Sequence, residues 1–200
     1  MLRLGFLASH AGTSMRAIVA AIHSGELEAE ARIAISNNAD SAALVFAREH
    51  GLAAAHISRK TAGSDEAADE AIDAALGAAG VELVILSGYL RMVGPRTLAH
   101  YRGRVLNVHP ALLPDFGGKG MYGRFVHEAV LAAGASESGA SVHIVDAVYD
   151  HGPVIAQKKV RVLATDTPQT LAERVVAIEG ALFVETLRAI AARGGAVQPA

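Results

Sequence analysis

The chain has 200 residues, of which 52% are hydrophobic and 19% charged, and its formal net charge at pH 7 is −2. This composition is typical of one globular domain with a sizeable core, and without a basic run it offers no case for nucleic-acid binding. The chain has no cysteine, which excludes disulfides, zinc ribbons and thiolate nucleophiles and fits a reducing compartment.

The opening segment MLRLGFLASHAG becomes polar too soon to span a membrane. It also lacks the cleavage pattern of a signal peptide. We therefore expect a cytoplasmic protein that binds neither membranes nor nucleic acid, with one domain over residues 1–200.

Short apolar runs alternate with helical spacings through the first half of the chain. We predict strands over 2–9, 31–36, 53–58 and 81–90, and helices through Met15, Ile18, Val19 and Ile22, from Asp40 or Ser41 to Gly51, over 65–79, and from Pro95. Such alternation implies crossover connections and a parallel sheet with helices on both faces.

The pattern changes after residue 105. Three strand-like runs, VLNVHP, ASVHIVDAVY and PVIAQKKVRVL, are separated by only one predicted helix (124–133). Strands in such a sequence favour antiparallel or mixed pairing. A last helix begins at Thr167-Pro168 and ends at Gly194-Gly195. Its inward positions are Leu171, Val175, Ile178 and Leu182. The sequence therefore predicts an α/β domain whose parallel half continues into a mixed sheet.

Asn107 and His109 interrupt the apolar run VLNVHP. Because side chains two apart in a strand point to the same face, we expect this pair to project together, away from Leu106 and Val108. Asparagine is depleted in strands and costly to bury unpaired, so the pair either caps a loop or belongs to a site. Pro110 ends the strand at His109, and ligands of open α/β sheets bind at such carboxyl ends. This position favours a site.

A carboxylate that would complete the pair is Asp150, in VYDHGPVI. Aspartate is also common in turns, and Asp146 is a competitor for the same role. An amide and a protonated imidazole donate hydrogen bonds to an oxyanion, while a carboxylate raises the imidazole pKa and moves protons. The three groups together indicate attack of an amine on a carbonyl carbon without a covalent enzyme intermediate.

The segment HAGTSM (10–15) follows the first predicted strand and opens a helix, where backbone N–H groups can bind phosphate. It matches neither GxGxxG nor GxxxxGKS, so it supports neither a dinucleotide nor a nucleoside triphosphate. His127-Glu128 has no second histidine four residues after the first, which excludes a zincin. We expect no metal.

Several blocks of the sequence together form a known pattern. They are LASHAGTSMRAI, SNNADSAALVFAREHG, LVILSGYLRMVGP, VLNVHPALLP and SGASVHIVDAVYDHGPVIAQ. With them, the chain resembles the phosphoribosylglycinamide formyltransferases over nearly its whole length. The last two blocks are the most specific, because N-x-H-P-[AS]-L-L-P followed by S-V-H-x-V-x(4)-D-x-G-P identifies the folate-dependent formyltransferases. The resemblance implies the formyltransferase fold, a Rossmann-like parallel half continuing into a mixed sheet.

The resemblance also implies an activity, namely formyl transfer from 10-formyltetrahydrofolate to the amine of phosphoribosylglycinamide in purine biosynthesis. Asn107 and protonated His109 would hold the tetrahedral oxyanion, and Asp150 would support the imidazole and relay a proton. The positions that match substrate contacts are Gly12, Thr13 and Ser14 for the phosphate and Glu179 for the ribose. The positions that match the folate pocket are Leu90, Arg91, Met92 and Val93, together with Asn107. We expect a monomer or a weak homodimer.

Two segments depart from the common pattern of this family. The phosphate loop commonly begins Ser-Gly-x-Gly, and here His10 stands at the first glycine. After ALLP, the chain reads FGGKGMYGRFVHEAV in place of the commoner P-G-L-H-T-H-R. Lys119, Tyr122 and Arg124 are therefore either substrate contacts or solvated loop residues. The LLP turn of the family favours a cis peptide bond between Leu113 and Pro114.

Two other functions use the same residues differently. A formyltetrahydrofolate hydrolase would use the three polar groups to activate water and release formate, but it has no phosphorylated acceptor for the loop at 10–15. A catalytically silent nucleotide-binding module would have little reason to keep Asn107 and His109 inside a core strand. The sequence favours the transferase over both.

Overall fold

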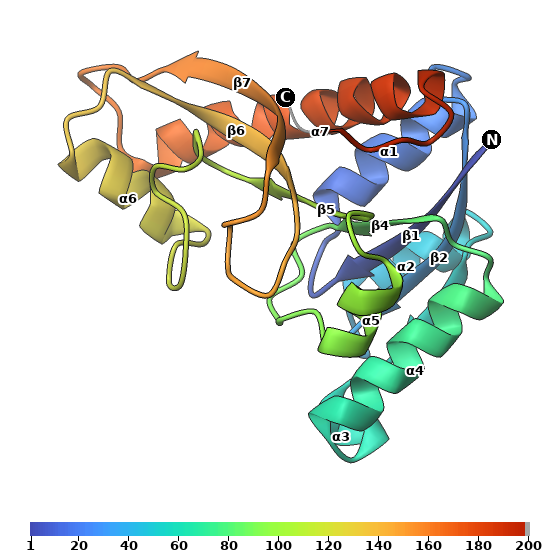
Figure 1. The fold of residues 1–200 in the computed structure, drawn as a ribbon. Coiled ribbons are helices and arrows are strands. Elements are labelled where there is room, and N and C mark those ends of the chain that lie inside the picture. Colours follow the sequence, from blue (N-terminus) through green and yellow to red (C-terminus); the bar gives the residue numbers. More distant parts are fainter. Residues whose placement is uncertain (199–200) are drawn as a thin grey trace.

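A computed structural model describes residues 1–198, in which seven strands form a single sheet in the order β3-β2-β1-β4-β5-β6-β7 (Figure 1). The strands are β1 (Leu2–Ala8), β2 (Ala29–Ser36), β3 (Ala53–His56), β4 (Leu83–Leu86), β5 (Val105–His109), β6 (Glu137–Ile144) and β7 (Val154–Arg161). The pairs from β3 to β5 are parallel, whereas β6 pairs antiparallel with both β5 and β7. The predicted fold class, a parallel half that continues into a mixed sheet, is confirmed. The last two residues of the predicted domain, 199–200, lie outside the described residues.

Helices connect the strands and cover both faces of the sheet. They are α1 (Thr13–His23), α2 (Ala42–Glu49), α3 (Arg59–Ala62), α4 (Asp65–Ala78), α5 (Pro95–His100), α6 (Arg124–Ala132) and α7 (Pro168–Ala192). Of the two caps considered for α2, Ser41 is the one used, because its side chain accepts a hydrogen bond from the Leu44 amide. The short helix α3 was not predicted.

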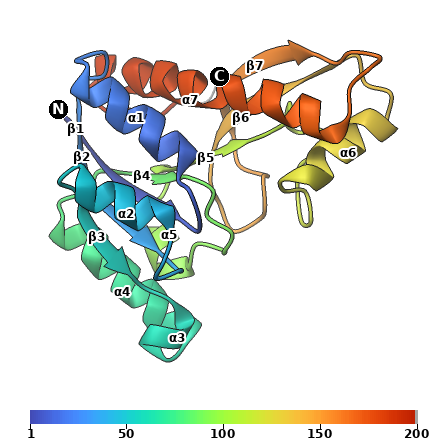
Figure 2. The same cartoon turned by 180° about the vertical axis from the view of Figure 1, so that it is seen from behind.

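The core has two layers, one on each face of the sheet. Leu4, Phe6 and Ala8 of β1 pack with α1, α2 and α7, which lie in front of the sheet in Figure 2. Leu7 of the same strand packs with Ile72 and Leu76 of α4 on the opposite face. Successive side chains of a strand point to opposite faces, so an apolar strand such as β1 serves both layers.

Three predicted strands are clearly shorter than expected, and one of them, 53–58, ends at His56. The run 81–90 forms a strand only over 83–86, because Gly88 takes a left-handed φ of 68° and turns the chain. The Ser87 hydroxyl accepts a hydrogen bond from the Met15 amide. The run ASVHIVDAVY ends as a strand at Ile144. After Asp146 the chain turns, since the side chain of Asp146 accepts a hydrogen bond from the Val148 amide. Asp150 therefore lies in a loop and does not follow a strand directly.

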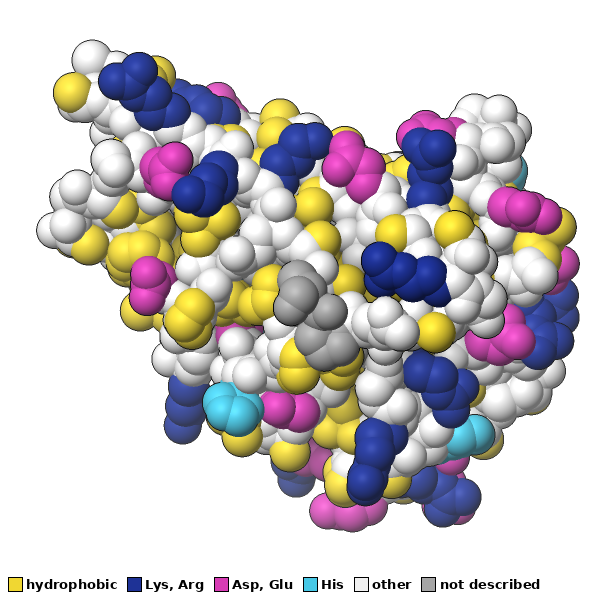
Figure 3. Space-filling view, turned by 45° about the horizontal axis from the view of Figure 1, so that its top comes forward, with side chains coloured by type: hydrophobic (Ala, Val, Ile, Leu, Met, Phe, Trp, Pro, Cys, Tyr) yellow, Lys and Arg dark blue, Asp and Glu magenta, His cyan; other side chains and the backbone are white. Residues whose placement is uncertain are grey.

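Helices α1 and α7 pack closely on the same face of the sheet. A Cβ atom added at Gly180 would lie 2.8 Å from the Cβ of Ala17, so this glycine allows the close approach and has a packing role in α7. No helix in residues 1–198 is both long and apolar enough to cross a bilayer. On the face drawn in Figure 3, Lys and Arg side chains are interspersed with Asp and Glu.

Candidate active site

Asn107 and His109 lie on β5, where the parallel part of the sheet meets the antiparallel part. Leu106 and Val108 pack in the core layer of α1 and α7, as expected for alternating positions. Asn107 and His109 share the other side of the strand. His109 is buried, with 3% of its surface exposed, and Asn107 is half-buried. The pair therefore points together, at the carboxyl end of the strand.

Asp150 meets this pair from the loop between β6 and β7. Its Oδ2 lies 3.4 Å from Nδ1 of His109 and accepts a hydrogen bond of 3.0 Å from the Gly118 amide. Asp150 has a φ of 54°, a left-handed conformation that aspartate tolerates better than most residues. Asp146, the competing carboxylate, instead accepts hydrogen bonds from Val148 and contacts the exposed His151. Asp150 is the carboxylate that the fold brings to His109.

His143 on β6 joins the same group, although the sequence analysis did not select it. In the antiparallel register it stands opposite Asn107. Its Nδ1 donates a hydrogen bond to the carbonyl of Ile144 at 3.0 Å, and its Nε2 lies 3.1 Å from Nδ2 of Asn107. The same Nε2 lies 3.5 Å from Oδ1 of Asp150. The histidine in the S-V-H motif was the available signal, but its partner depends on the strand register.

The electrostatics of the group are set by burial and by mutual contacts. Burial lowers the pKa of His109 below its usual 6.5, which outweighs the opposite effects of the Asp150 carboxylate and the bond to Phe116. Burial raises the pKa of Asp150, but the contact with His143, the charge of His109 and the Gly118 amide lower it more, to a value below 3.8. Asp150 is therefore ionised at neutral pH, beside a histidine whose protonation depends on this charge.

Backbone atoms of the loop after β5 complete the surroundings of His109. Nε2 of His109 donates a hydrogen bond of 2.8 Å to the carbonyl of Phe116. The Leu113–Pro114 peptide bond in the same loop is cis, as the resemblance favoured. Ser141 on β6 fixes the start of this loop, because its Oγ accepts from the Leu113 amide at 2.9 Å and donates to the Ala111 carbonyl at 2.6 Å.

The loop between β1 and α1 has the form of an anion site. Gly12 is the N-cap of α1 with a φ of 66° and has no side chain to cap the helix. The Ser87 hydroxyl accepts a hydrogen bond from the Met15 amide in the first turn of α1. The amides of its first turn, at Thr13 and Ser14, are the groups that bind phosphate at helix N-termini. His10 is exposed, and its φ is not positive, since Phe116 and Asp150 are the positive-φ non-glycine residues of the described chain. Glycine is thus not required at this position.

Residues 90–93, which connect β4 to α5, line a cavity of about 1650 Å³. The side chains of Leu90 and Met92 are 55% and 45% exposed, whereas Val93 is buried. Tyr149, the neighbour of Asp150, also lines this cavity.

Glu179 of α7 lines a second cavity, of about 460 Å³, with Pro110, Arg124 and His127. Burial raises the pKa of Glu179 from its usual 4.5 to about 7. Arg124, which lines this cavity, pairs with Glu128. Lys119 and Tyr122, the other two residues considered in this loop, are exposed and line neither cavity among the described residues.

The three polar groups stand between these two cavities. Asn107, His109 and Asp150 are absent from both linings within residues 1–198, but Tyr149 precedes Asp150 in the larger one and Pro110 follows His109 in the smaller one. The structure thus brings the three together, with residues 90–93 and Glu179 in the two neighbouring cavities. Residues 12–14 are in neither lining among the described residues. The part of the chain that the structure describes contains no cluster of three or more side chains that could hold a metal.

Comparison with known proteins defines the class of this molecule. Residues 2–187 match the family model described as formyl transferase. The chain therefore belongs to the formyl transferase family.

Several of the relatives that it matches are phosphoribosylglycinamide formyltransferases. The chain is 34% identical to phosphoribosylglycinamide formyltransferase of Escherichia coli, over 88% of this chain and 81% of that protein. It is 38% identical to the enzyme of that name, described as chloroplastic, from Arabidopsis thaliana, over 94% of this chain. The chain spans only 65% of that plant protein's length.

Solved structures agree with this placement. Glycinamide ribonucleotide transformylase 1 of Symbiobacterium toebii superposes with a TM-score of 0.89 at 36% identity, over 97% of this chain and 89% of that one. A formyltetrahydrofolate deformylase of Pseudomonas syringae shares the fold at 24% identity, over 94% of this chain and 60% of that one, with a TM-score of 0.82.

Proposed function

We propose that this chain is an enzyme that transfers the formyl group of 10-formyltetrahydrofolate to the amine of phosphoribosylglycinamide in de novo purine biosynthesis. The observation that carries the proposal is the meeting of Asn107, His109 and Asp150 at the end of β5 in a member of the formyl transferase family. The name phosphoribosylglycinamide formyltransferase, which relatives in Arabidopsis thaliana and Escherichia coli carry, supports this choice of acceptor.

In the proposed reaction, the acceptor amine attacks the formyl carbon and a C–N bond forms. The electron pair of the C=O double bond moves to oxygen and creates a tetrahedral oxyanion. Asn107 uses one Nδ2–H toward His143, so its second N–H is available to the oxyanion. Removing one such donor typically slows a reaction by about 10²–10³-fold. Breakdown of this adduct reforms C=O and breaks the bond to the folate nitrogen.

His109 and Asp150 have complementary tasks in this scheme. Negative charge that develops on the formyl oxygen favours the imidazolium form of His109, which burial disfavours in the free protein. Asp150 stabilises the positive charge of this imidazolium. It also passes the proton lost by the amine toward the departing folate nitrogen, through water. The formyl carbon changes partner, and no bond to the enzyme forms.

The hydrogen bond between His109 and Phe116 gives this scheme a structural requirement. Nε2 of His109 donates a hydrogen bond to the Phe116 carbonyl at 2.8 Å. This nitrogen carries a single hydrogen, so it has one hydrogen bond to donate. The formyl oxygen must therefore take the place of the Phe116 carbonyl, and the loop after β5 must shift when substrates bind. Phe116 itself has a φ of 56°, a conformation that is unfavourable for a bulky residue.

The surrounding segments are assigned to the substrates because their sequences resemble the matching segments of the family. Amides of Thr13 and Ser14, with Gly12 at the cap, would hold the phosphate of the acceptor, and Glu179 would accept a hydrogen bond from its ribose. Residues 90–93 and Asn107 would contact the pterin of the folate, largely through backbone groups. The proposal also includes one domain, a cytoplasmic location, no metal and a monomer or weak homodimer.

The proposal is tested by incubating the protein with 10-formyltetrahydrofolate, with and without phosphoribosylglycinamide, and following the folate spectrum. Turnover that needs the acceptor supports the transferase. Equal turnover without acceptor would identify a hydrolase, and no turnover in either case would leave a binding module. Chelator treatment before the assay tests the expectation that no metal takes part, and sedimentation analysis tests the oligomeric state.

A further inference from the structure

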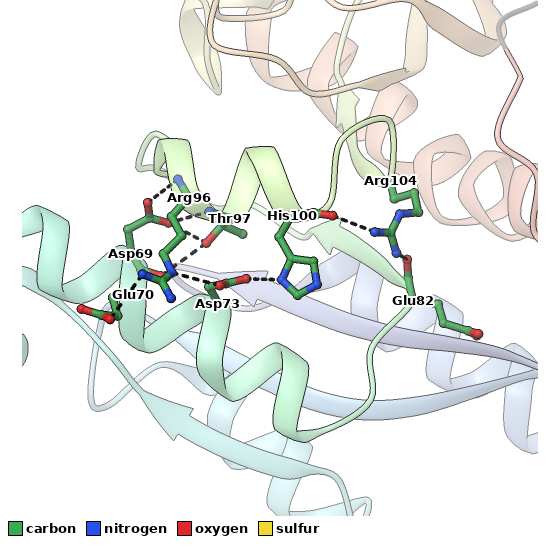
Figure 4. A network of polar contacts seen from close by, with 8 residues as sticks. All are labelled: Asp69, Glu70, Asp73, Glu82, Arg96, Thr97, His100 and Arg104. Carbon is green, nitrogen blue, oxygen red and sulfur yellow. Dashed lines mark hydrogen bonds and ion pairs between the residues drawn. The ribbon is translucent and has the colours of Figure 1, made fainter.

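A polar cluster outside the three catalytic groups joins α4 to α5. Figure 4 shows side chains of α4 facing those of α5, with dashed lines for their contacts. The cluster consists of Asp69, Glu70 and Asp73 on α4 and Arg96, Thr97 and His100 on α5, with Arg104 and Glu82 beside it. Within it, Asp69 is a buried carboxylate with 6% of its surface exposed. A buried carboxylate is costly unless its oxygens are well paired.

The oxygens of Asp69 are paired mainly with the backbone of α5. Oδ2 accepts from the Arg96 amide at 2.8 Å, and Oδ1 accepts from the Thr97 amide at 3.1 Å and the Thr97 hydroxyl at 2.6 Å. The N-cap of α5 is Gly94, which has no side chain to cap it. Asp69 therefore supplies from α4 the cap that α5 lacks in its own sequence.

Asp69 also lies directly against the chain that leads into α5. A Cβ atom added at Gly94 would lie 2.1 Å from Cγ of Asp69, so only glycine leaves room for this contact. Gly94 immediately follows residues 90–93, and both Asp69 and Gly94 line the same cavity of about 1650 Å³ as that segment. The carboxylate thus fixes the backbone at the point where the segment ends.

The other end of the segment is held by Ser9, which directly follows β1. Oγ of Ser9 accepts a hydrogen bond of 2.8 Å from the Leu90 amide, and the Ser9 amide donates to the Gly88 carbonyl at 3.1 Å. The stretch 91–94 lies between the contact with Ser9 and the contact with Asp69, and in it Arg91 and Met92 are exposed. Two buried side chains therefore define the course of the whole segment.

We propose that Asp69 is a positioning residue for the folate, acting through the backbone of residues 90–93. This inference rests on the proposed function, because it assigns that segment to 10-formyltetrahydrofolate. Losing the cap frees the carboxyl end of the segment, so the affinity for the folate falls. Within residues 1–198, the hydrogen bonds and ion pairs of the cluster join α4 to α5 and do not reach the phosphate loop or Glu179, so the affinity for the acceptor stays the same.

The neighbouring ion pairs of the cluster supply matched controls. Glu70 contacts the Arg96 guanidinium at 3.3 Å, and their side chains are 66% and 60% exposed. Such exposed pairs contribute little, and Glu70 does not touch the backbone of α5 in the contacts of the described residues. Glu70→Gln removes a carboxylate from the same helix, one residue away, and leaves the cap in place.

The experiment compares Asp69→Ala, Asp69→Asn and Glu70→Gln for kcat and for the KM of each substrate. We expect Asp69→Ala to raise the KM for 10-formyltetrahydrofolate about tenfold or more, with the acceptor KM and kcat within about threefold. Asp69→Asn, which keeps one acceptor oxygen, should give a smaller rise. Glu70→Gln should leave all three constants within twofold. A purely structural role would lower the active fraction, and so the apparent kcat, with unchanged KM.

Thr97 provides a second test if Asp69→Ala does not fold. Thr97→Val removes the hydroxyl that donates to Asp69, and Thr97→Ser restores it. The folate KM should rise in the first variant and return in the second. Equal changes in both KM values, or a loss of kcat alone, would overturn the inference.

Hydrogen exchange separates failure of this inference from failure of the proposed function. If wild-type protein shows no acceptor-dependent turnover, the proposed function fails. The amides of residues 90–97 should still exchange faster in Asp69→Asn and Thr97→Val than in Glu70→Gln, with exchange elsewhere unchanged. Unchanged exchange in this segment would show that Asp69 does not hold it.

Discussion

The two halves of the sheet use buried polar side chains differently. In the half before β5, they are mostly hydroxyls that accept hydrogen bonds from backbone amides, as Ser9 does from Leu90 and Ser87 from Met15. In the half from β5 onward, the buried polar side chains include all three buried histidines of the described chain. These are His109, His127 and His143.

This difference separates the residues that would position the substrates from those that would take part in the proposed chemistry. Hydroxyls and the carboxylate of Asp69 shape the backbone segments that would grip ligands, while the antiparallel junction supplies groups that titrate. We therefore expect substitutions in the first half to change KM and substitutions at the junction to change kcat. The predictions below test this division, from the largest expected effect to the smallest.

Removing an oxyanion donor should have the largest effect. We expect Asn107→Ala and His109→Ala each to lower kcat by about 10²–10³-fold, with the KM of both substrates within a few-fold. His151→Ala is the matched control, because His151 is an exposed histidine one residue from Asp150 that contacts Asp146. Steady-state kinetics would contradict the division if kcat survived in the two junction variants.

Replacing Asp150 should change the pH dependence as well as the rate. Activity should fall as pH rises through the pKa of His109, since the imidazolium is lost, and as pH falls through the lowered pKa of Asp150. Asp150→Asn removes a charge that raises the pKa of His109, so the alkaline limb should move to lower pH and kcat should fall about 10²-fold. A wild-type profile that is flat from about pH 5 to 9, or an unmoved limb in the variant, would refute this assignment.

A change in the phosphate loop should affect binding and not chemistry. Gly12 has a φ of 66°, and an added Cβ would lie 3.1 Å from both Ala43 and Met15, so Gly12→Ala strains the loop. We expect the acceptor KM to rise about tenfold, with kcat and the folate KM nearly unchanged. Gly25→Ala is the control, because Gly25 has a φ of 77° with nothing within 4 Å. A fall in kcat at constant KM would break the comparison.

The last expected effect is on stability and not on activity, at Glu179. Its pKa is raised from 4.5 to about 7 by burial, so the folded state favours the neutral acid and loses stability as pH rises from the lower value through the higher one. The difference between the two values corresponds to at most about 3 kcal/mol. Glu179→Gln should therefore match the wild type below about pH 4.5 and unfold at a higher temperature than the wild type above about pH 7. Thermal unfolding of both proteins across this range provides the measurement, and parallel curves would contradict it.

Much of the fold was predictable because local patterns agree with it. Continuous apolar runs and helical spacings located β1, α1 and α4, and the cap at Thr167 located the start of α7. The strand predicted over 81–90 was too long, because Gly88 takes a left-handed φ, a turn that the apolar pattern cannot reveal. The helix α3 was missed because a short capped turn over Arg59–Ala62 has no buried face to give a period.

The site was predictable only where a polar side chain is unusual for its place in the sequence. Asn107 and His109 stood out as polar residues in an apolar strand, and Asp150 stood out beside a Gly-Pro turn. His143 did not, because its role follows from a register that sets it opposite Asn107. The Phe116 carbonyl and the Gly118 amide are backbone groups, which every residue carries and no sequence pattern marks.

The most direct test is whether the Asn107 amide and the His109 ring, two residues apart on β5, stabilise the same negative oxygen. Single-turnover formyl-transfer rates would be measured for Asn107→Ala, His109→Ala and the double variant at saturating concentrations of both ligands. Groups that act as one unit are strongly non-additive, so the double variant should be little slower than the slower single variant. A double variant whose loss equals the product of the two single losses would show independent action and contradict the account.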